Sequence, residues 1–329
     1  MKNILVIGAT GFIGKHLIQK LSQKNYKISC LVRETSKKED IAYLKKMKVK
    51  LLLGDLNSPN TLGNICRGID GVFYLAGGGD VASLSKQDFK KLESYNLTTL
   101  QNFLDSIKKL KKIVFFSSIS AMGVQVGNVI DENTLCIPKI PHEQCKFQAE
   151  KLIKKYSKTK GYSFSILRPS IVYGEYGFGD SFNMIKMLNK GYFFMPGNGN
   201  NTTPWVYVDN VVDAAVLLME NGKNQEYIIN HKESISFNKI INLVSKTLNK
   251  KVIIFHIPVF ILKPLVFLHE KISLAMGKSP ILNLYRLKSM TSDRIYSINK
   301  IEDIGYKEKL NFEKGILKTI SWYKKNGYL

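Results

Sequence analysis

Arginine is scarce in this chain of 329 residues, although its formal net charge is +23. Proteins that read nucleic acids usually use the forked donors of arginine, and the chain has neither a basic tail nor a nucleic-acid-binding motif. We therefore expect no nucleic-acid partner, and we attribute the charge to a general lysine bias. Five of the 49 basic residues are arginines: Arg33, Arg67, Arg168, Arg286 and Arg294.

Cysteine is also scarce, and no two cysteines have C-x-x-C or zinc-ligand spacing, so no metal site is predicted. The chain enters an apolar run without a secretory leader, which favours a cytoplasmic location with reduced thiols. Its most apolar stretch, residues 252–268, is interrupted by Lys263 and is shorter than the roughly 20 residues of a membrane-spanning helix. The cysteines are Cys30, Cys66, Cys136 and Cys145.

Short apolar runs alternate with helical patterns through the first half of the chain. Long helical patterns cover residues 89–108 and 143–158. This alternation is typical of an α/β fold with a doubly wound parallel sheet. Strands are predicted at residues 3–7, 27–32, 49–53, 71–75, 113–116 and 163–167.

The first predicted strand ends in a glycine-rich turn. Gly8 permits the tight turn, Gly11 allows the backbone to approach a pyrophosphate, and Gly14 allows the following helix to pack on the sheet. The amino terminus of that helix presents free N–H groups to the phosphates. This strand–turn–helix context predicts a Rossmann-type dinucleotide-binding fold.

Two side chains after later strands bear on the choice of dinucleotide. Arg33 suits the 2′-phosphate of NADP, whereas Glu34 beside it leaves NAD open, so NADP is slightly favoured. Asp55, after the third strand, is expected near the adenine, although a turn or cap role explains it equally well.

The second half of the chain is less regular. Residues 192–204 are predicted to be a loop, and the last hundred residues mostly helical, ending in a helix over residues 312–325. We expect a dinucleotide-binding domain of residues 1–173 with roughly 204–230, and a smaller, mostly helical substrate-binding lobe of residues 174–203 and 231–329.

Several further motifs occur in a fixed order. With the G-x-x-G-x-x-G turn, they resemble the extended short-chain dehydrogenase/reductase family of the NAD-dependent epimerase/dehydratase type over essentially the whole chain. The motifs are Leu75-Ala76-Gly77, Asn96 in YNLT, Ser117-Ser118, Lys146 before Ala149-Glu150, LRPSIVYG at residues 167–174, and Val208-Asp209-Asn210-Val211.

The resemblance implies an enzyme that binds NADP or NAD and a small-molecule substrate, and it allows a homodimer. It implies cofactor contacts from Gly8, Thr10, Gly11, Phe12, Ile13, Gly14, Arg33, Asp55, Leu56, Leu75, Ala76, Gly77, Asn96, Lys146 and Ile171.

The family's catalytic serine and lysine correspond to Ser118 and Lys146, but His142 occupies the tyrosine position. His142 lies one helical turn before Lys146, so both are expected on one face of a helix. In one interpretation His142 is the acid/base, since imidazole titrates near neutrality and a lysine cation nearby favours its neutral form. In a second, Cys145, a loop tyrosine such as Tyr173, or water supplies the proton. In a third, catalysis is lost and a dinucleotide-binding protein remains.

The substrate is expected at the carboxyl ends of the strands, lined by residues 77–80, 118–126, 174–180 and 195–205. Nucleotide-sugar members usually have a diphosphate-binding arginine about seven residues before the aspartate matched by Asp209, but this chain has Thr202 there. A nucleotide sugar remains the first expectation. A dihydroflavonol-reductase-like or 3β-hydroxysteroid-dehydrogenase-like reductase of a lipid-like alcohol or ketone is the second.

Residues 257–276 have apolar side chains at helical spacing. We expect a core helix of the C-terminal lobe. The alternative is an interfacial helix near Lys263, Lys271 and Lys278 that collects a lipid-like substrate. Contact with a membrane surface is the less favoured expectation.

Overall fold

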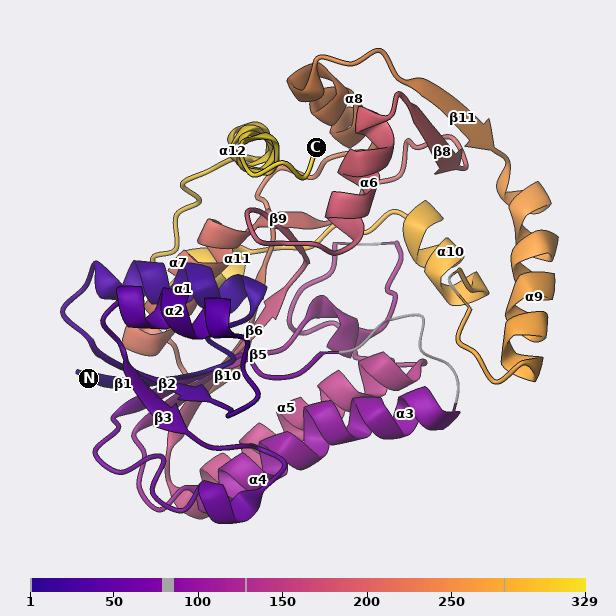
Figure 1. The fold of residues 1–329 in the computed structure, drawn as a ribbon. Helices are drawn as coiled ribbons and strands as arrows, with labels where there is room; N and C mark the ends of the chain where they lie inside the picture. Colours follow the sequence, from indigo (N-terminus) through magenta and orange to yellow (C-terminus); the bar gives the residue numbers. More distant parts are fainter. Residues whose placement is uncertain (1, 79–85, 128, 281) are drawn as a thin grey trace.

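A seven-stranded parallel sheet forms the centre of the computed structural model, which describes residues 2–78, 86–127, 129–280 and 282–329 (Figure 1). The spatial order is β10-β6-β5-β4-β1-β2-β3, and it reverses between β1 and β4. The predicted doubly wound parallel sheet is therefore confirmed, with its ligand-binding switch point at β1 and β4. The strands are β1 (Asn3–Ile7), β2 (Lys27–Val32), β3 (Lys50–Leu53), β4 (Gly71–Tyr74), β5 (Lys112–Phe116), β6 (Ser163–Pro169) and β10 (Gln225–Ile229).

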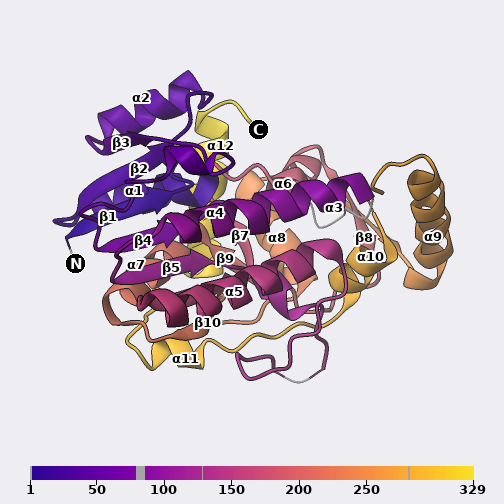
Figure 2. The ribbon, with the colours of Figure 1, turned by 90° about the horizontal axis from the view of Figure 1, so that it is seen from below.

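Helices cover both faces of this sheet, which explains why its strands are continuous apolar runs rather than alternating ones. One face packs on α1, α2 and α7, and the other on α4 and α5. In Figure 2 the α3–α4 segment runs beside α5. These helices are α1 (Phe12–Ser22), α2 (Lys38–Lys46), α3 (Lys86–Glu93), α4 (Thr99–Ser106), α5 (Pro141–Lys160) and α7 (Val208–Asn221), with 3₁₀ turns at Pro59–Thr61 and Ile119–Met122.

The remaining elements build a second core beyond the carboxyl ends of the strands. α6, α8 and α12 pack together there, beside two short parallel sheets, β7–β9 and β8–β11. The elements are β7 (Ile171–Tyr173), α6 (Asp180–Asn189), β8 (Tyr192–Pro196), β9 (Trp205–Tyr207), α8 (Phe237–Leu248), β11 (Ile253–Ile257), α9 (Val259–Ala275), α10 (Leu284–Thr291), α11 (Asn299–Glu302) and α12 (Phe312–Lys325).

Two predictions of local structure were wrong. Residues 192–204 are not all loop, because β8 pairs with β11 about sixty residues later, a partner that no local pattern reveals. The helix predicted at 89–108 is interrupted by a π-helical turn at Ser94–Thr98. In that turn the side chain of Asn96 donates to the Leu92 carbonyl at 2.8 Å, and such turns are frequent at functional sites.

The expectation that residues 257–276 form a core helix was also wrong. Within α9 only Val266 is buried, and most of its large apolar side chains face solvent. No described helix is both long and apolar enough to cross a membrane.

Candidate active site

The glycine turn has the backbone geometry that a dinucleotide requires. Gly8 has φ +89°, and a β-carbon at Gly14 would lie 2.2 Å from the Gly8 carbonyl oxygen. Gly11 caps α1 without a side-chain hydrogen bond, so the N-cap residue leaves the first N–H groups of that helix free for a ligand. Thr10, Phe12 and Ile13 complete the turn and the start of α1. A pyrophosphate fits this uncapped helix start.

Three predicted cofactor residues from distant segments meet beside the end of β4. A β-carbon at Gly77 would lie 2.9 Å from Asn96 Oδ1 and 3.3 Å from Lys146 Nζ. Asn96 Nδ2 donates to the Gly78 carbonyl at 2.8 Å. Leu75 and Ala76, which follow β4, are half-buried at the start of this loop. The close approach leaves no room for a side chain at Gly77.

The predicted adenosine contacts follow the next two strands at the same edge of the sheet. Arg33 follows β2 and is exposed, and its backbone N–H donates to Ser36 Oγ at 3.0 Å. Asp55 follows β3 and accepts a hydrogen bond from Asn57 N at 2.9 Å. Leu56 is half-buried against the core. Arg33 and Asp55 therefore both follow the carboxyl ends of the neighbouring strands β2 and β3.

α5 carries the remaining two predicted catalytic residues. His142 is buried in its first turn, and Lys146 lies one turn later. Burial lowers the pKa of Lys146 to about 8. The neighbouring Cys145 thiol is also buried, and its raised pKa keeps it protonated.

Tyr173 is not the loop tyrosine that one interpretation needed. It lies in β7 and is fully buried. Its hydroxyl lies 2.9 Å from His231 Nε2 and donates to the Phe312 carbonyl at 3.2 Å. Because its hydroxyl is buried with these core partners, Tyr173 has a structural role and does not supply the proton.

A cavity of about 490 Å³ lies between the strand ends and the second core. Ser118 forms part of its wall, and its Oγ accepts a hydrogen bond from Ser120 N at 3.1 Å. Ile171 also lines it, whereas His142 and Lys146 are not among its lining residues although Glu143 is. Other lining residues include Asp180, Thr203, Trp205, Arg286 and Arg294.

The loops predicted to line the substrate site account for only part of the cavity wall. Residues 118–120, Gly123, Val124, Asp180, Thr203 and Trp205 line it, as expected. From the predicted loop 77–80, residues 79 and 80 lie outside the described part of the chain. The sequence missed α10 and the segment after it, which contribute Tyr285, Arg286 and Arg294.

Arg294 is the most unusual of these side chains. It is 8% exposed, and its Nε has no hydrogen-bond partner among the described residues. Burial lowers its pKa. Its backbone N–H donates to the Thr202 carbonyl at 3.2 Å, so Arg294 lies beside the position where the sequence lacked an arginine. A buried guanidinium with an unused Nε donor suits an anionic ligand. In the sequence, the rarity of arginine was the signal that could have drawn attention to Arg294.

A buried ion pair fixes α5 against the sheet. Arg168 on β6 donates to both carboxylate oxygens of Glu150 on α5, at 2.9 and 2.7 Å. Ser117 Oγ, at the end of β5, donates to the same carboxylate at 2.6 Å. These contacts position the helix that carries His142 and Lys146 next to the serine pair.

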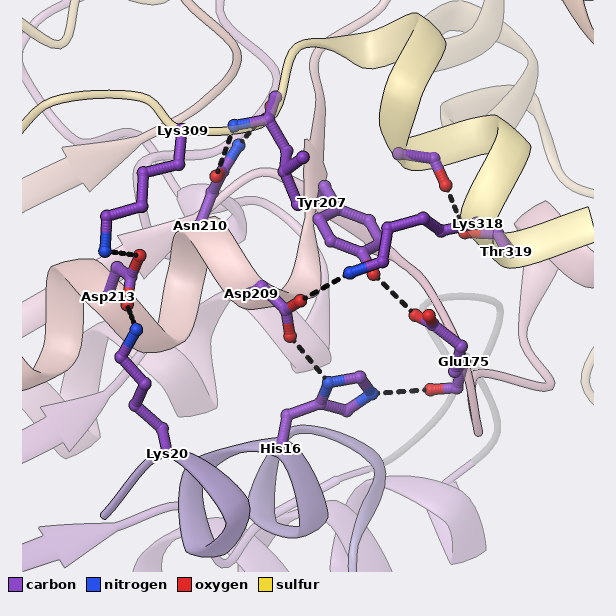
Figure 3. A network of polar contacts seen from close by, with 12 residues as sticks. His16, Lys20, Glu175, Tyr207, Asp209, Asn210, Asp213, Lys309, Lys318 and Thr319 are labelled. Atoms are coloured by element: carbon purple, nitrogen blue, oxygen red, sulfur yellow. Dashed lines mark hydrogen bonds and ion pairs between the residues drawn. The ribbon is translucent and has the colours of Figure 1, made fainter. Parts of the chain in front are cut away.

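A second polar network joins α1 to α7 and α12 (Figure 3). His16 Nδ1 lies 2.8 Å from Asp209 Oδ1, and its Nε2 lies 2.9 Å from the Glu175 carbonyl oxygen. Lys318 on α12 approaches Asp209 Oδ2 at 3.4 Å, and Tyr207 donates to Glu175 Oε2 at 2.7 Å. The Asp209 motif thus links the helix of the glycine turn to the second core.

The model of the NAD dependent epimerase/dehydratase family matches residues 4–230. The chain belongs to this family. The predicted family is confirmed, and with it an enzyme fold of the NAD(P)-dependent kind.

Individual relatives span almost the whole chain. An N-acetyl-alpha-D-glucosaminyl-diphospho-ditrans,octacis-undecaprenol 4-epimerase of Escherichia coli O157:H7 is 25% identical, covering 97% of this chain and 95% of that protein. A sterol-4-alpha-carboxylate 3-dehydrogenase (decarboxylating) of Saccharomyces cerevisiae is 27% identical, covering 97% of each.

A solved structure shows the same fold. The UDP-glucose 4-epimerase of Thermotoga maritima, crystallised with UDP-glucose, superposes with a TM-score of 0.79 at 22% identity, covering 98% of this chain and 99% of that one.

Proposed function

We propose that this protein is an NAD(P)-dependent epimerase or dehydratase that acts at a hydroxyl/ketone centre of a sugar carried on a diphosphate. The buried and unpartnered Nε of Arg294, in the cavity that Ser118 lines, carries the proposal. A diphosphate supplies the anionic acceptors that this guanidinium lacks. Arg286 lies in the same wall, where its Nη2 pairs with Asp180 Oδ1 at 2.6 Å.

A nucleotide sugar is the first substrate class. The named substrates of two relatives share a sugar linked to a diphosphate, with a nucleoside in one and a polyprenyl chain in the other. We expect the sugar to lie at Ser118 and the diphosphate at Arg294. The group on the far side of the diphosphate, a nucleoside or a polyprenyl chain, distinguishes the two carriers.

We expect three residues of the chain to have separate roles in the reaction. A bound nicotinamide dinucleotide supplies the hydride acceptor. We expect the Ser118 hydroxyl to hold the substrate oxygen and the Lys146 ammonium to hold cofactor hydroxyls. His142 takes the proton of the substrate hydroxyl, through a bridging water because imidazole is shorter than the phenol it replaces.

The choice of dinucleotide, the cellular location and the assembly also belong to this proposal. Exposed Arg33 after β2 supports NADP, whereas UDP-glucuronic acid 4-epimerase of Bacillus cereus was crystallised with NAD, which supports NAD.

We also propose a cytoplasmic location, and a homodimer as the assembly to test first.

A reductase of a lipid-like alcohol or ketone is the second candidate. The cavity wall includes Met184, Met187, Phe193, Phe237 and Met290, and the yeast relative is named for a sterol substrate. Such a substrate has no need of Arg294. A dinucleotide-binding protein without catalysis is the third candidate, because His142 replaces the family tyrosine.

Binding of UDP separates the first two candidates. We expect Arg294→Met to weaken UDP binding about tenfold, measured by isothermal titration calorimetry, since a charge-assisted hydrogen bond is lost. Arg67→Met removes an exposed arginine elsewhere and is the matched control. UDP that fails to bind, or that binds Arg294→Met as well as the wild type, contradicts the diphosphate site.

Three variants at one position test the acid/base. We expect turnover of a sugar diphosphate by the wild type and its loss in His142→Ala, measured by chromatography of the epimerised sugar. Higher turnover in His142→Tyr would identify a weakened family site. No turnover in any of the three, with dinucleotide binding retained, favours the non-catalytic alternative.

A further inference from the structure

α9, together with β11 before it and the paired strand β8, exposes many large apolar side chains. We call this the α9 surface. In a protein surrounded only by water, so many exposed large apolar side chains in neighbouring segments are disfavoured and usually mark an interaction site. Its exposed side chains are Phe194, Ile253, Phe255, Phe260, Ile261, Leu265, Phe267, Leu268, Ile272 and Met276.

α9 is a peripheral helix. α9 lies at one end of the molecule in both views (Figures 1 and 2). With 17 residues it is about 25 Å long. Among the described helices none has the length and apolar character to span a bilayer. A helix of this kind binds a membrane by lying in the interface.

The charge around the α9 surface specifies the type of partner. Between residues 250 and 278 there are five lysines and a single acidic residue, Glu270. Glu270 Oε2 faces inward, where it accepts a hydrogen bond from Leu284 N at 3.0 Å. The flanking charge presented outward is therefore positive. The lysines are Lys250, Lys251, Lys263, Lys271 and Lys278, all exposed.

We propose that the α9 surface docks on an anionic lipid bilayer. Apolar side chains enter the interface while lysines contact anionic headgroups, and each part strengthens the other. A second copy of this chain fits less well, because a two-fold contact would bring the same lysines against one another.

The α9 surface also adjoins the cavity. α9 packs on α10, which supplies Tyr285 and Arg286 to the cavity wall, and His269 Nδ1 lies 3.3 Å from the Leu282 carbonyl oxygen just before α10. If the proposed diphosphate site holds, docking brings that site to the membrane. This consequence rests on the proposed function, whereas docking itself does not.

Vesicle binding by the full-length protein tests the proposal. We expect sedimentation with vesicles of phosphatidylglycerol and phosphatidylethanolamine, and much weaker sedimentation with phosphatidylcholine alone. Phe260→Ser with Leu265→Ser should lower the partition coefficient at least about tenfold. The matched control is Leu135→Ser with Leu317→Ser, since the two pairs are similarly exposed (77% and 60% against 75% and 56%).

Each alternative outcome overturns the proposal. A wild type that does not bind anionic vesicles contradicts it, as does an α9 variant that binds as well as the control. Light scattering that shows an oligomer lost in the α9 variant, without vesicle binding by the wild type, assigns the α9 surface to a second copy. Arg294→Met should bind vesicles normally, so failure of the diphosphate site is recognised separately.

Discussion

Single residues in this protein matter most where a charge is buried. Among the described residues, Nη1 of Arg168 and Nε of Arg294 are both buried without a hydrogen-bond partner. The charge of Arg168 is nevertheless compensated by an ion pair with the buried Glu150. Chemistry alone does not distinguish two arginines in a sequence, but their partners do. The compensated side chain holds an element in place, and the uncompensated one is available to a ligand.

The charge of Lys146 depends on pH close to neutrality. Burial lowers its pKa to about 8, so the ammonium is lost as the pH rises through that value. If the cation acts in catalysis, kcat/KM should fall above about pH 8, up to tenfold per pH unit. Lys146→Arg retains the charge and should remove this alkaline limb of the pH–rate profile.

Lys151→Arg provides the matched control for Lys146, because Lys151 is an exposed lysine on the same helix. It should leave the profile unchanged. An alkaline limb that persists at the same pH in Lys146→Arg would assign the titration to another group.

At the scale of elements, α5 depends on contacts with two strands. Its first turn holds His142, while Glu150 two turns later fixes it to β5 and β6 through Ser117 and Arg168. The sequence showed Glu150 and Arg168 only as parts of separate motifs. Their pairing required the sheet to place β5 and β6 side by side.

Glu150→Gln tests that anchor. Removing the carboxylate leaves the buried Arg168 charge with only the longer contact to Glu226 Oε1 at 4.0 Å, which should lower the free energy of unfolding by about 3 kcal/mol. Urea denaturation measures the change. Lys111→Met breaks the exposed pair with Asp70 instead and should cost less than about 1 kcal/mol. Equal losses in the two variants would mean that the buried pair does not anchor α5.

At the scale of the whole molecule, the Asp209 network joins the nucleotide-binding side to the second core. Burial by itself would raise the pKa of Asp209, but the hydrogen bond and charge of His16, together with Lys318, hold that pKa below its usual value. A carboxyl whose pKa is lowered by folding stabilises the folded state above its unfolded pKa of about 4. This contribution is lost as the pH falls.

Asp209→Asn should therefore lower stability at pH 7 and matter less in acid. We expect a loss below about 1 kcal/mol at neutral pH, because the Asp209 side chain is 39% exposed. The difference from the wild type in the urea midpoint should shrink as the pH is lowered below about 4. Asp303→Asn, an exposed carboxyl, is the control. A difference that grows in acid would contradict the assignment.

The sequence by itself determined the elements whose signals are local. The glycine turn, the alternation of strand and helix, and the bounds of the last helix follow from neighbouring residues, since turn geometry and amphipathic periodicity act over a few positions. The order of family motifs likewise led to the predictions for Ser118, Lys146 and His142, which stay predictions.

Only the tertiary structure decided how distant segments meet. It brought Arg294 beside Thr202 and paired β8 with β11. It also left α9 exposed, although its apolar pattern is the same as that of a core helix. Hydrophobic periodicity indicates which side chains share an apolar face of a helix. Whether that face is buried depends on which other elements the tertiary fold places against it.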